Sequence, residues 1–141
     1  MHLLLTDEQQ ELQQTVAKFL ATQSPMSVVR EVMTGETGYD EKLWQRLCGE
    51  LGLAGLAIPE AYGGAGYGPI ERSVVLEELG AALTPSPFFS SIVLAAEVLL
   101  ASDDVEVSGE LLPAIARGEL RATVAVTEGR AGWGGTVSTV A

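Results

Sequence analysis

The sequence has little cysteine and few basic side chains, and each shortage excludes a class of site. Among 141 residues there is one cysteine, Cys48, which excludes an internal disulfide and a metal site built from several thiolates. Eight basic residues stand against 19 acidic ones, a formal net charge of −11, so there is no basic stripe to neutralise phosphates. An anionic membrane surface would repel the same charge. We therefore expect neither nucleic acid nor a membrane as a partner.

Long apolar segments and targeting signals are also lacking. Residues 1–5 have no basic flank and Asp7 and Glu8 follow at once, so the start does not resemble a signal peptide. The longest apolar stretch, residues 88–100, contains Glu97 and is too short to span a bilayer. Because a lone cysteine suits a reducing compartment, these features together predict a cytoplasmic protein.

Hydrophobic residues make up 47% of the chain, and their spacing predicts helices. A chain of this length can form a core, and so much apolar surface also indicates a contact with another surface. Thr6 and Gln9 form a capping box before an apolar stripe, and Asp40 is a good N-cap for a later helix. We expect six helices, at about residues 6–22, 24–33, 40–51, 69–83, 88–101 and 110–117. The fourth is expected to direct toward the core Ile70, Val74, Val75, Leu79 and Leu83.

The hydrophobic period changes after Gly118. Residues 121–127 alternate and are rich in β-branched side chains, which is typical of a strand, and residues 136–140 are a candidate second strand. Two strands alone do not form a stable sheet. The expected fold is therefore all-α, an orthogonal or up-down bundle of about six helices over residues 1–119. Residues 120–141 are expected to begin a truncated second domain with one or two β-strands.

Four glycines fall within residues 61–68, between the third and fourth predicted helices. Their spacing does not match the dinucleotide-binding pattern G-x-G-x-x-G, because, counting from Gly64, the last glycine position holds Pro69. Such glycine density favours a structural turn with positive φ angles. Cys48 and Trp44 fit the buried face of a helix. The sequence has no Ser/His/Asp set, so it indicates no catalytic residue.

Four blocks of sequence are more specific together than any single motif. They are LGLAGLAIPEAYGGAG at residues 51–66, VLEELG at 75–80, LLPAIARGE at 111–119 and AVTE at 125–128. In their order and spacing they resemble the N-terminal domain of acyl-CoA dehydrogenases, over residues 6 to about 129. The resemblance implies a helical domain, a middle β domain and a C-terminal helical bundle, with FAD held between them.

The resemblance also implies the reaction and its partners. In this family a glutamate removes the α-proton of an acyl-CoA thioester while the β-hydrogen leaves as a hydride to flavin N5. The product is a trans-2-enoyl-CoA, and the electrons pass to an electron-transferring flavoprotein. The glutamate usually lies in the C-terminal bundle, which this chain does not contain, so the chain alone is expected to be inactive. These residues do not define the acyl group, which could be fatty or sterol-like.

By the same resemblance, the end of the first expected strand contacts the flavin. Val126 and Thr127 would offer backbone amides and a hydroxyl to the ring, whereas an ordinary strand end is the alternative. Just beyond, residues 129–135 replace the usual Gly-Ser-Asp continuation, so the serine that contacts the pyrophosphate is absent. The Gly132 amide could still donate a hydrogen bond. This departure fits a divergent member, or a partner subunit whose flavin site has decayed.

Residues 85–90 lie where the family lines the far end of the acyl pocket. Ser86, Phe88 and Phe89 are the candidate substrate-binding residues, although core packing explains the two phenylalanines equally well. Three interpretations of the chain stay open. It is part of a flavin-dependent acyl-CoA dehydrogenase, a non-catalytic subunit of a hetero-oligomer, or a free-standing helical interaction module, which the four blocks disfavour.

Overall fold

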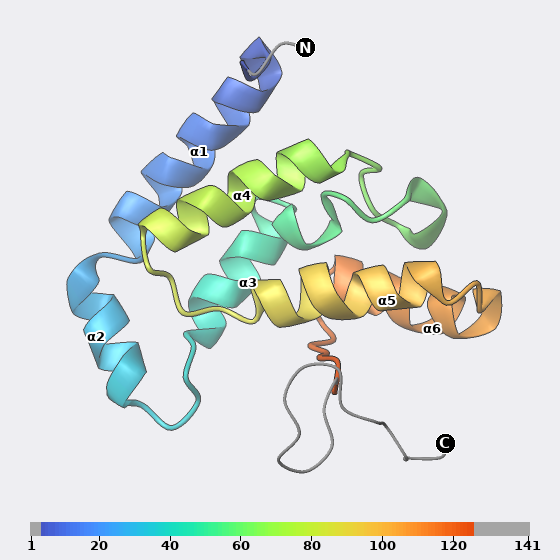
Figure 1. The fold of residues 1–141 in the computed structure, drawn as a ribbon. Coiled ribbons are helices and arrows are strands. Elements are labelled where there is room, and N and C mark those ends of the chain that lie inside the picture. The colour runs from blue at the N-terminus through green and yellow to red at the C-terminus, as the bar shows by residue number, and fades with distance from the viewer. Residues whose placement is uncertain (1–3, 126–141) are drawn as a thin grey trace.

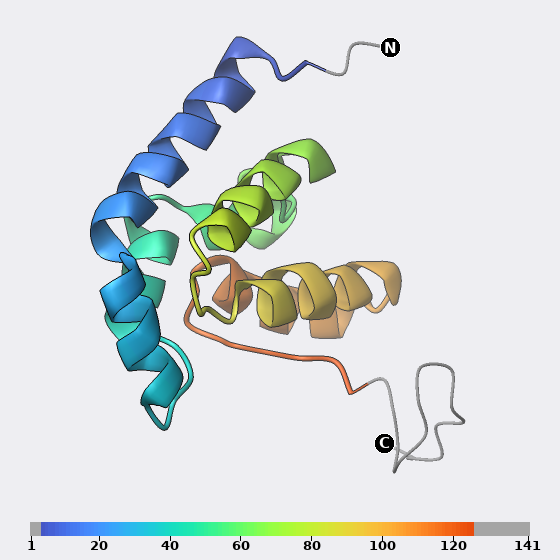
Figure 2. The ribbon, with the colours of Figure 1, turned by 60° about the vertical axis from the view of Figure 1, so that its left-hand side comes forward.

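Six α-helices and three short helical segments make up the computed structural model, which describes residues 4–125 (Figure 1). Helices α1 and α4 pack against each other, and α5 and α6 run next to each other (Figures 1 and 2). Residues 4–125 contain no strand, which confirms the all-α class of this part. The elements are α1 Asp7–Gln23, α2 Met26–Thr34, α3 Glu41–Gly49, the 3-10 turns η1 Leu53–Gly55 and η2 Glu60–Tyr62, α4 Pro69–Ala81, the π-helical η3 Phe89–Ala95, α5 Ala96–Ala101 and α6 Val105–Ala116.

Two predicted helix starts are confirmed by their caps. At α1, Thr6 Oγ1 accepts from the Gln9 N–H at 3.2 Å, and Gln9 Oε1 accepts from the Thr6 N–H at 3.0 Å, which completes the capping box. At α3, Asp40 Oδ1 accepts from the N–H groups of Lys42 and Leu43 at 2.8 and 3.2 Å. Each cap satisfies amides that have no partner inside their own helix.

The sixth helix is longer than the sequence predicts. α6 begins at Val105 rather than near residue 110, because Asp104 caps it there: its Oδ1 accepts from the Val107 N–H at 3.0 Å. The prediction follows the inward-facing apolar residues, which begin only at Leu111. Val105 and Val107 are exposed, so the first turns of α6 contribute little to that pattern.

The fifth predicted helix is confirmed in extent but not in geometry. Its first part, η3, is π-helical, with the Ala96 N–H donating to Ser91 O, and only its second part, α5, is α-helical. Apolar periodicity does not distinguish these two geometries over so short a segment. Within the part of the chain that the structure describes, no helix is long and apolar enough to cross a membrane.

The predicted strands are not seen in the described part of the chain. Residues 121–125, the larger part of the first predicted strand, are assigned neither helix nor strand. A strand is defined by pairing with a neighbour. Residues 126–127, which complete the first predicted strand, and residues 136–140, the second one, lie outside the described residues.

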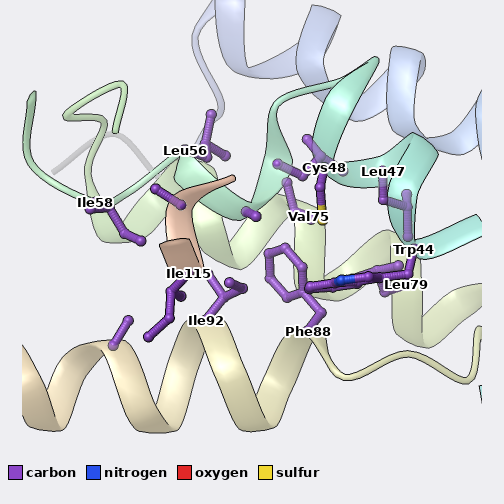
Figure 3. Packing of buried hydrophobic residues seen from close by; sticks show 14 of the residues in the cluster. Trp44, Leu47, Cys48, Leu56, Ile58, Val75, Leu79, Phe88, Ile92 and Ile115 are labelled. Atoms are coloured by element: carbon purple, nitrogen blue, oxygen red, sulfur yellow. The ribbon is translucent and has the colours of Figure 1, made fainter. Parts of the chain in front are cut away.

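The core is centred on two aromatic side chains, Trp44 and Phe88, each only 1% exposed. Residues from α1, α3, α4, η3, α5 and α6 join them in one cluster (Figure 3). Burial of large apolar side chains like these is the main favourable term in folding a domain of this size. The helical part therefore has a continuous core of its own.

Two residues of the fourth predicted helix do not lie in this core. Ile70 and Leu83 are 55% and 61% exposed, so their predicted burial is wrong. Val74, Val75 and Leu79 are buried as predicted. Ile70 stands in the first turn of α4, at the edge of the packed region. Leu83 lies beyond Ala81, the last residue of the helix, and its φ of 50° shows that helical spacing no longer directs it inward.

The glycine-rich loop between α3 and α4 is a structural turn, as predicted. Gly63 and Gly66 have φ angles of 77° and 69°, in the left-handed region that favours glycine. A Cβ at Gly64 would collide with the carbonyl of Ile58, so glycine allows the two backbone segments to approach. Three backbone hydrogen bonds of 2.9 Å hold the loop against the preceding connector: Ala65 N–H to Gly55 O, Gly66 N–H to Ile58 O and Tyr67 N–H to Leu56 O.

Candidate functional site

The three candidate substrate-binding residues line one pocket, of about 260 Å³, between the end of α4 and the start of η3. Their exposure differs. Phe88 is 1% exposed and belongs to the core, whereas the Phe89 side chain is 56% exposed and free to contact a ligand. Ser86 is half-buried. The pocket is mainly apolar, as a site for an aliphatic or ring group requires. Its other lining residues are Leu76, Leu79, Gly80, Leu83 and Thr84.

The chain leaves the helical region through residues 118–125, which lead toward the predicted flavin contacts. Within this segment, Ala122 exchanges two hydrogen bonds of 3.0 Å with the hydroxyl of Ser91. The candidate flavin contacts Val126, Thr127 and Gly132 lie outside the described residues.

A second and larger pocket, of about 600 Å³, lies between α1, the residues around η1 and the first turn of α4. No local sequence pattern marks this pocket, because its walls come from three separate stretches of the chain. An anionic coenzyme A ester is a poor occupant, since like charges repel and the lining holds three carboxylates. The acidic lining residues are Glu8, Glu11 and Glu71, and the apolar ones include Leu12, Leu51 and Leu56.

Glu71, at the edge of this larger pocket, has a structural role. Gln9 Nε2 donates to Glu71 Oε1 at 2.8 Å, and the Gly68 N–H donates to Glu71 Oε2 at 3.0 Å. The Gln9 hydrogen bond, followed by those from backbone amides, lowers the pKa of Glu71 below its ordinary value. The carboxylate therefore stays charged at neutral pH, where it caps α4 and does not serve as an acid.

Cys48 and Trp44 are buried, as the sequence predicts. Burial raises the pKa of the Cys48 thiol to about 12, so the thiol is protonated at neutral pH and is a poor nucleophile. The Trp44 Nε1–H donates to Gly118 O at 2.8 Å, which satisfies the ring nitrogen inside the core. Among residues 4–125, no group of three or more His, Cys, Asp or Glu side chains is placed to hold a metal ion.

Sequence comparison with known proteins finds several acyl-CoA dehydrogenases. The chain is 39% identical over 115 residues to the acyl-CoA dehydrogenase IpdE2 of Mycobacterium tuberculosis, covering 81% of this chain and 36% of that protein. It is 32% identical over 133 residues to the acyl-CoA dehydrogenase FadE12 of the same species, covering 90% of this chain and 32% of that protein. The chain thus spans about a third of the length of these relatives.

Solved structures agree with the sequence comparison. A steroid ACAD variant, Tcur3481-Tcur3483 G363A, matches with a TM-score of 0.77 and 38% identity, over 86% of this chain and 33% of that chain. The ChsE4-ChsE5 complex from Mycobacterium tuberculosis matches with a TM-score of 0.83 and 29% identity, over 92% of this chain and 35% of that chain. The family profile for the acyl-CoA dehydrogenase N-terminal domain matches residues 6–119. This chain therefore belongs to the acyl-CoA dehydrogenase family.

Proposed function

We propose that this chain is the N-terminal helical part of an FAD-dependent acyl-CoA dehydrogenase, which converts an acyl-CoA thioester to a trans-2-enoyl-CoA. The family membership of residues 6–119 carries the proposal. In it, residues 1–119 form the helical domain and residues 120–141 begin the middle β domain. Bound FAD supplies the hydride acceptor. The glutamate that removes the α-proton belongs to a part of the protein outside this chain.

The apolar pocket next to η3 is assigned to the far end of the acyl group. Phe89 offers an exposed ring, Phe88 forms a rigid wall because it is fixed in the core, and Ser86 adds a hydroxyl. A ring system gains more from such rigid apolar walls than a short chain does, because it buries more area. The 38% identity to a protein described as a steroid ACAD supports a steroid-derived acyl group.

A second candidate function is that of a non-catalytic subunit in a hetero-oligomer. The observation in its favour is the glycine-rich run at residues 129–135, which lacks the serine that contacts the pyrophosphate in the family pattern. Two of the solved relatives are described by pairs of protein names, Tcur3481-Tcur3483 and ChsE4-ChsE5. In either function the protein is an oligomer. If the protein is the catalytic dehydrogenase, its expected electron acceptor is an electron-transferring flavoprotein.

The visible absorption spectrum of the protein purified from its complete reading frame separates the two functions. A dehydrogenase is yellow when expressed alone, and its flavin is bleached by an acyl-CoA substrate. A non-catalytic subunit is colourless alone and yields a yellow complex only when it is expressed together with a catalytic homologue. A protein that is colourless in both experiments rules out both functions.

Within a yellow protein, Thr127→Val tests the assigned flavin contact. Loss of the hydroxyl is expected to weaken FAD binding by about tenfold, the usual effect of removing one net hydrogen bond. Thr123→Val is the matched control, because Thr123 lies on the same segment with an exposed side chain. An equal FAD dissociation constant in the two variants removes Thr127 from the site.

A further inference from the structure

Residues 118–125 run along one side of the helical domain before leaving it (Figure 2). The first residues of this segment are tied to α3 and α6. Gly118 O accepts from Trp44 Nε1–H at 2.8 Å, and the N–H groups of Glu119 and Leu120 donate to Ala114 O at 3.0 and 3.1 Å. These contacts fix where the segment starts. At residue 121 the Arg121 side chain pairs with Glu41 of α3 at 2.9 Å, a contact made by the side chain and not by the backbone that continues to Ala122.

The contact at Ala122 comes from a different element, η3. Ser91 Oγ donates to Ala122 O and accepts from the Ala122 N–H, each at 3.0 Å. One hydroxyl thus satisfies both backbone groups of Ala122, as a neighbouring strand would do in a sheet. The side chain makes this contact from inside the core, since Ser91 is 0% exposed.

The neighbouring serine shows that this contact is particular to position 91. Ser90 is only half-buried, and its Oγ donates to Pro87 O within its own turn. Ser91 instead bonds across 31 residues of sequence. It also lies in a π-helical segment, a geometry that is rare in proteins and occurs frequently at functional sites.

We propose that Ser91 is a positioning residue that sets the direction in which residues 122–125 leave the helical domain. In the proposed function the chain continues from there to the flavin contacts, so FAD binding is expected to depend on Ser91. This inference rests on the proposed function, because the flavin contacts are part of it. Ser91 needs no contact with FAD or substrate in this role. Without its hydroxyl, both partly buried backbone groups of Ala122 lose their partner, and the backbone after Arg121 is no longer hydrogen-bonded to η3.

The test compares Ser91→Ala, Ser91→Thr and Ser90→Ala in the full-length protein. The first readout is hydrogen exchange at the Ala122 amide, which is independent of flavin. Ser91→Ala is expected to speed this exchange by about tenfold, as loss of one net hydrogen bond implies, without a matching change at Leu120. Ser91→Thr keeps the hydroxyl and is expected to restore slow exchange. Ser90→Ala is expected to leave it unchanged.

The second readout is the FAD dissociation constant, expected to rise severalfold in Ser91→Ala and to recover in Ser91→Thr. Unchanged exchange at Ala122 overturns the role of Ser91 whatever the flavin does. Faster exchange with unchanged FAD binding overturns the dependence of FAD binding on Ser91 but leaves the proposed function standing. A wild-type protein that binds no FAD, alone or with a homologue, refutes the proposed function itself. If Ser91→Ala does not fold, Ser91→Cys, which keeps a donor in the same place but a weaker one, is measured instead.

Discussion

The junction of α3 with the end of α6 differs sharply from α2 and the loop that follows it. In the junction, formed by Trp44, Leu47 and Cys48 with Ile115 and Gly118, every residue is buried. In α2 only Val29 is buried, and Met33 is 72% exposed. Both regions carry apolar residues at helical spacing, so spacing alone does not decide burial. The difference lies in what each helix faces: α3 packs against several elements of the core, whereas α2 lies at the periphery (Figure 1).

The largest expected effect comes from a pair of glycines, one in each region. Gly118 and Gly38 have nearly equal φ angles, 72° and 70°. A Cβ at Gly118 would collide with the Cys48 side chain, whereas at Gly38 it would meet nothing within 4 Å. Gly38→Ala is expected to lower the free energy of unfolding by about 1–2 kcal/mol, the cost of left-handed backbone. Gly118→Ala adds overpacking and is expected to cost about 2–5 kcal/mol in total. Equal losses in urea denaturation would show that the junction is not tightly packed.

A smaller effect is expected from Trp44→Phe, which keeps an aromatic ring but removes the Nε1–H donor and part of the ring volume. The buried Gly118 carbonyl then loses its partner, at a cost of about 1–3 kcal/mol in the free energy of unfolding. Tyr67→Phe, at a residue that is 54% exposed, removes a polar atom from another aromatic ring and serves as the control. The same urea denaturation measures both. A Trp44→Phe variant as stable as the control contradicts the importance of this hydrogen bond.

The smallest effect is expected at the periphery. Met33→Ser in α2 replaces a large apolar side chain that is mostly exposed, so the free energy of unfolding is expected to change by no more than about 0.5 kcal/mol. Thermal unfolding of the variant and the parent, under identical conditions, measures the difference. A loss as large as that of Trp44→Phe would mean that α2 is packed in solution, and the contrast between the two regions would fail.

Much of the fold could be predicted because its signals are local. The capping box at Thr6 and the N-cap at Asp40 act within one turn, so the residues that form them stand close together in the sequence. The start of α6 is harder to predict from the sequence, because Val105 and Val107 in its first turns are exposed and do not continue the inward apolar pattern. The exposure of Ile70 and Leu83 depends on where the helix and its packing partners end. A periodic pattern of apolar residues carries no information about those ends.

For the candidate site, the sequence indicates which residues lie together, whereas their role in binding stays a prediction. Ser86, Phe88 and Phe89 share one pocket because they are near neighbours in the chain. The Ser91 contact with Ala122 spans 31 residues and involves a backbone partner, so no side-chain pattern in the sequence reveals it. The larger pocket likewise depends on α1 meeting the residues around η1 and α4. Such pairings arise from tertiary packing.

The side-chain amide of Gln9 has a consequence for how the domain opens. Its oxygen accepts from the amide of Thr6, the N-cap of α1, and its nitrogen donates to Glu71, the carboxylate that holds the Gly68 amide at the start of α4. The first turns of two helices that are 62 residues apart in sequence are therefore linked through one group. Fraying at one of these ends removes support from the other, so the two are expected to loosen as a single cooperative unit.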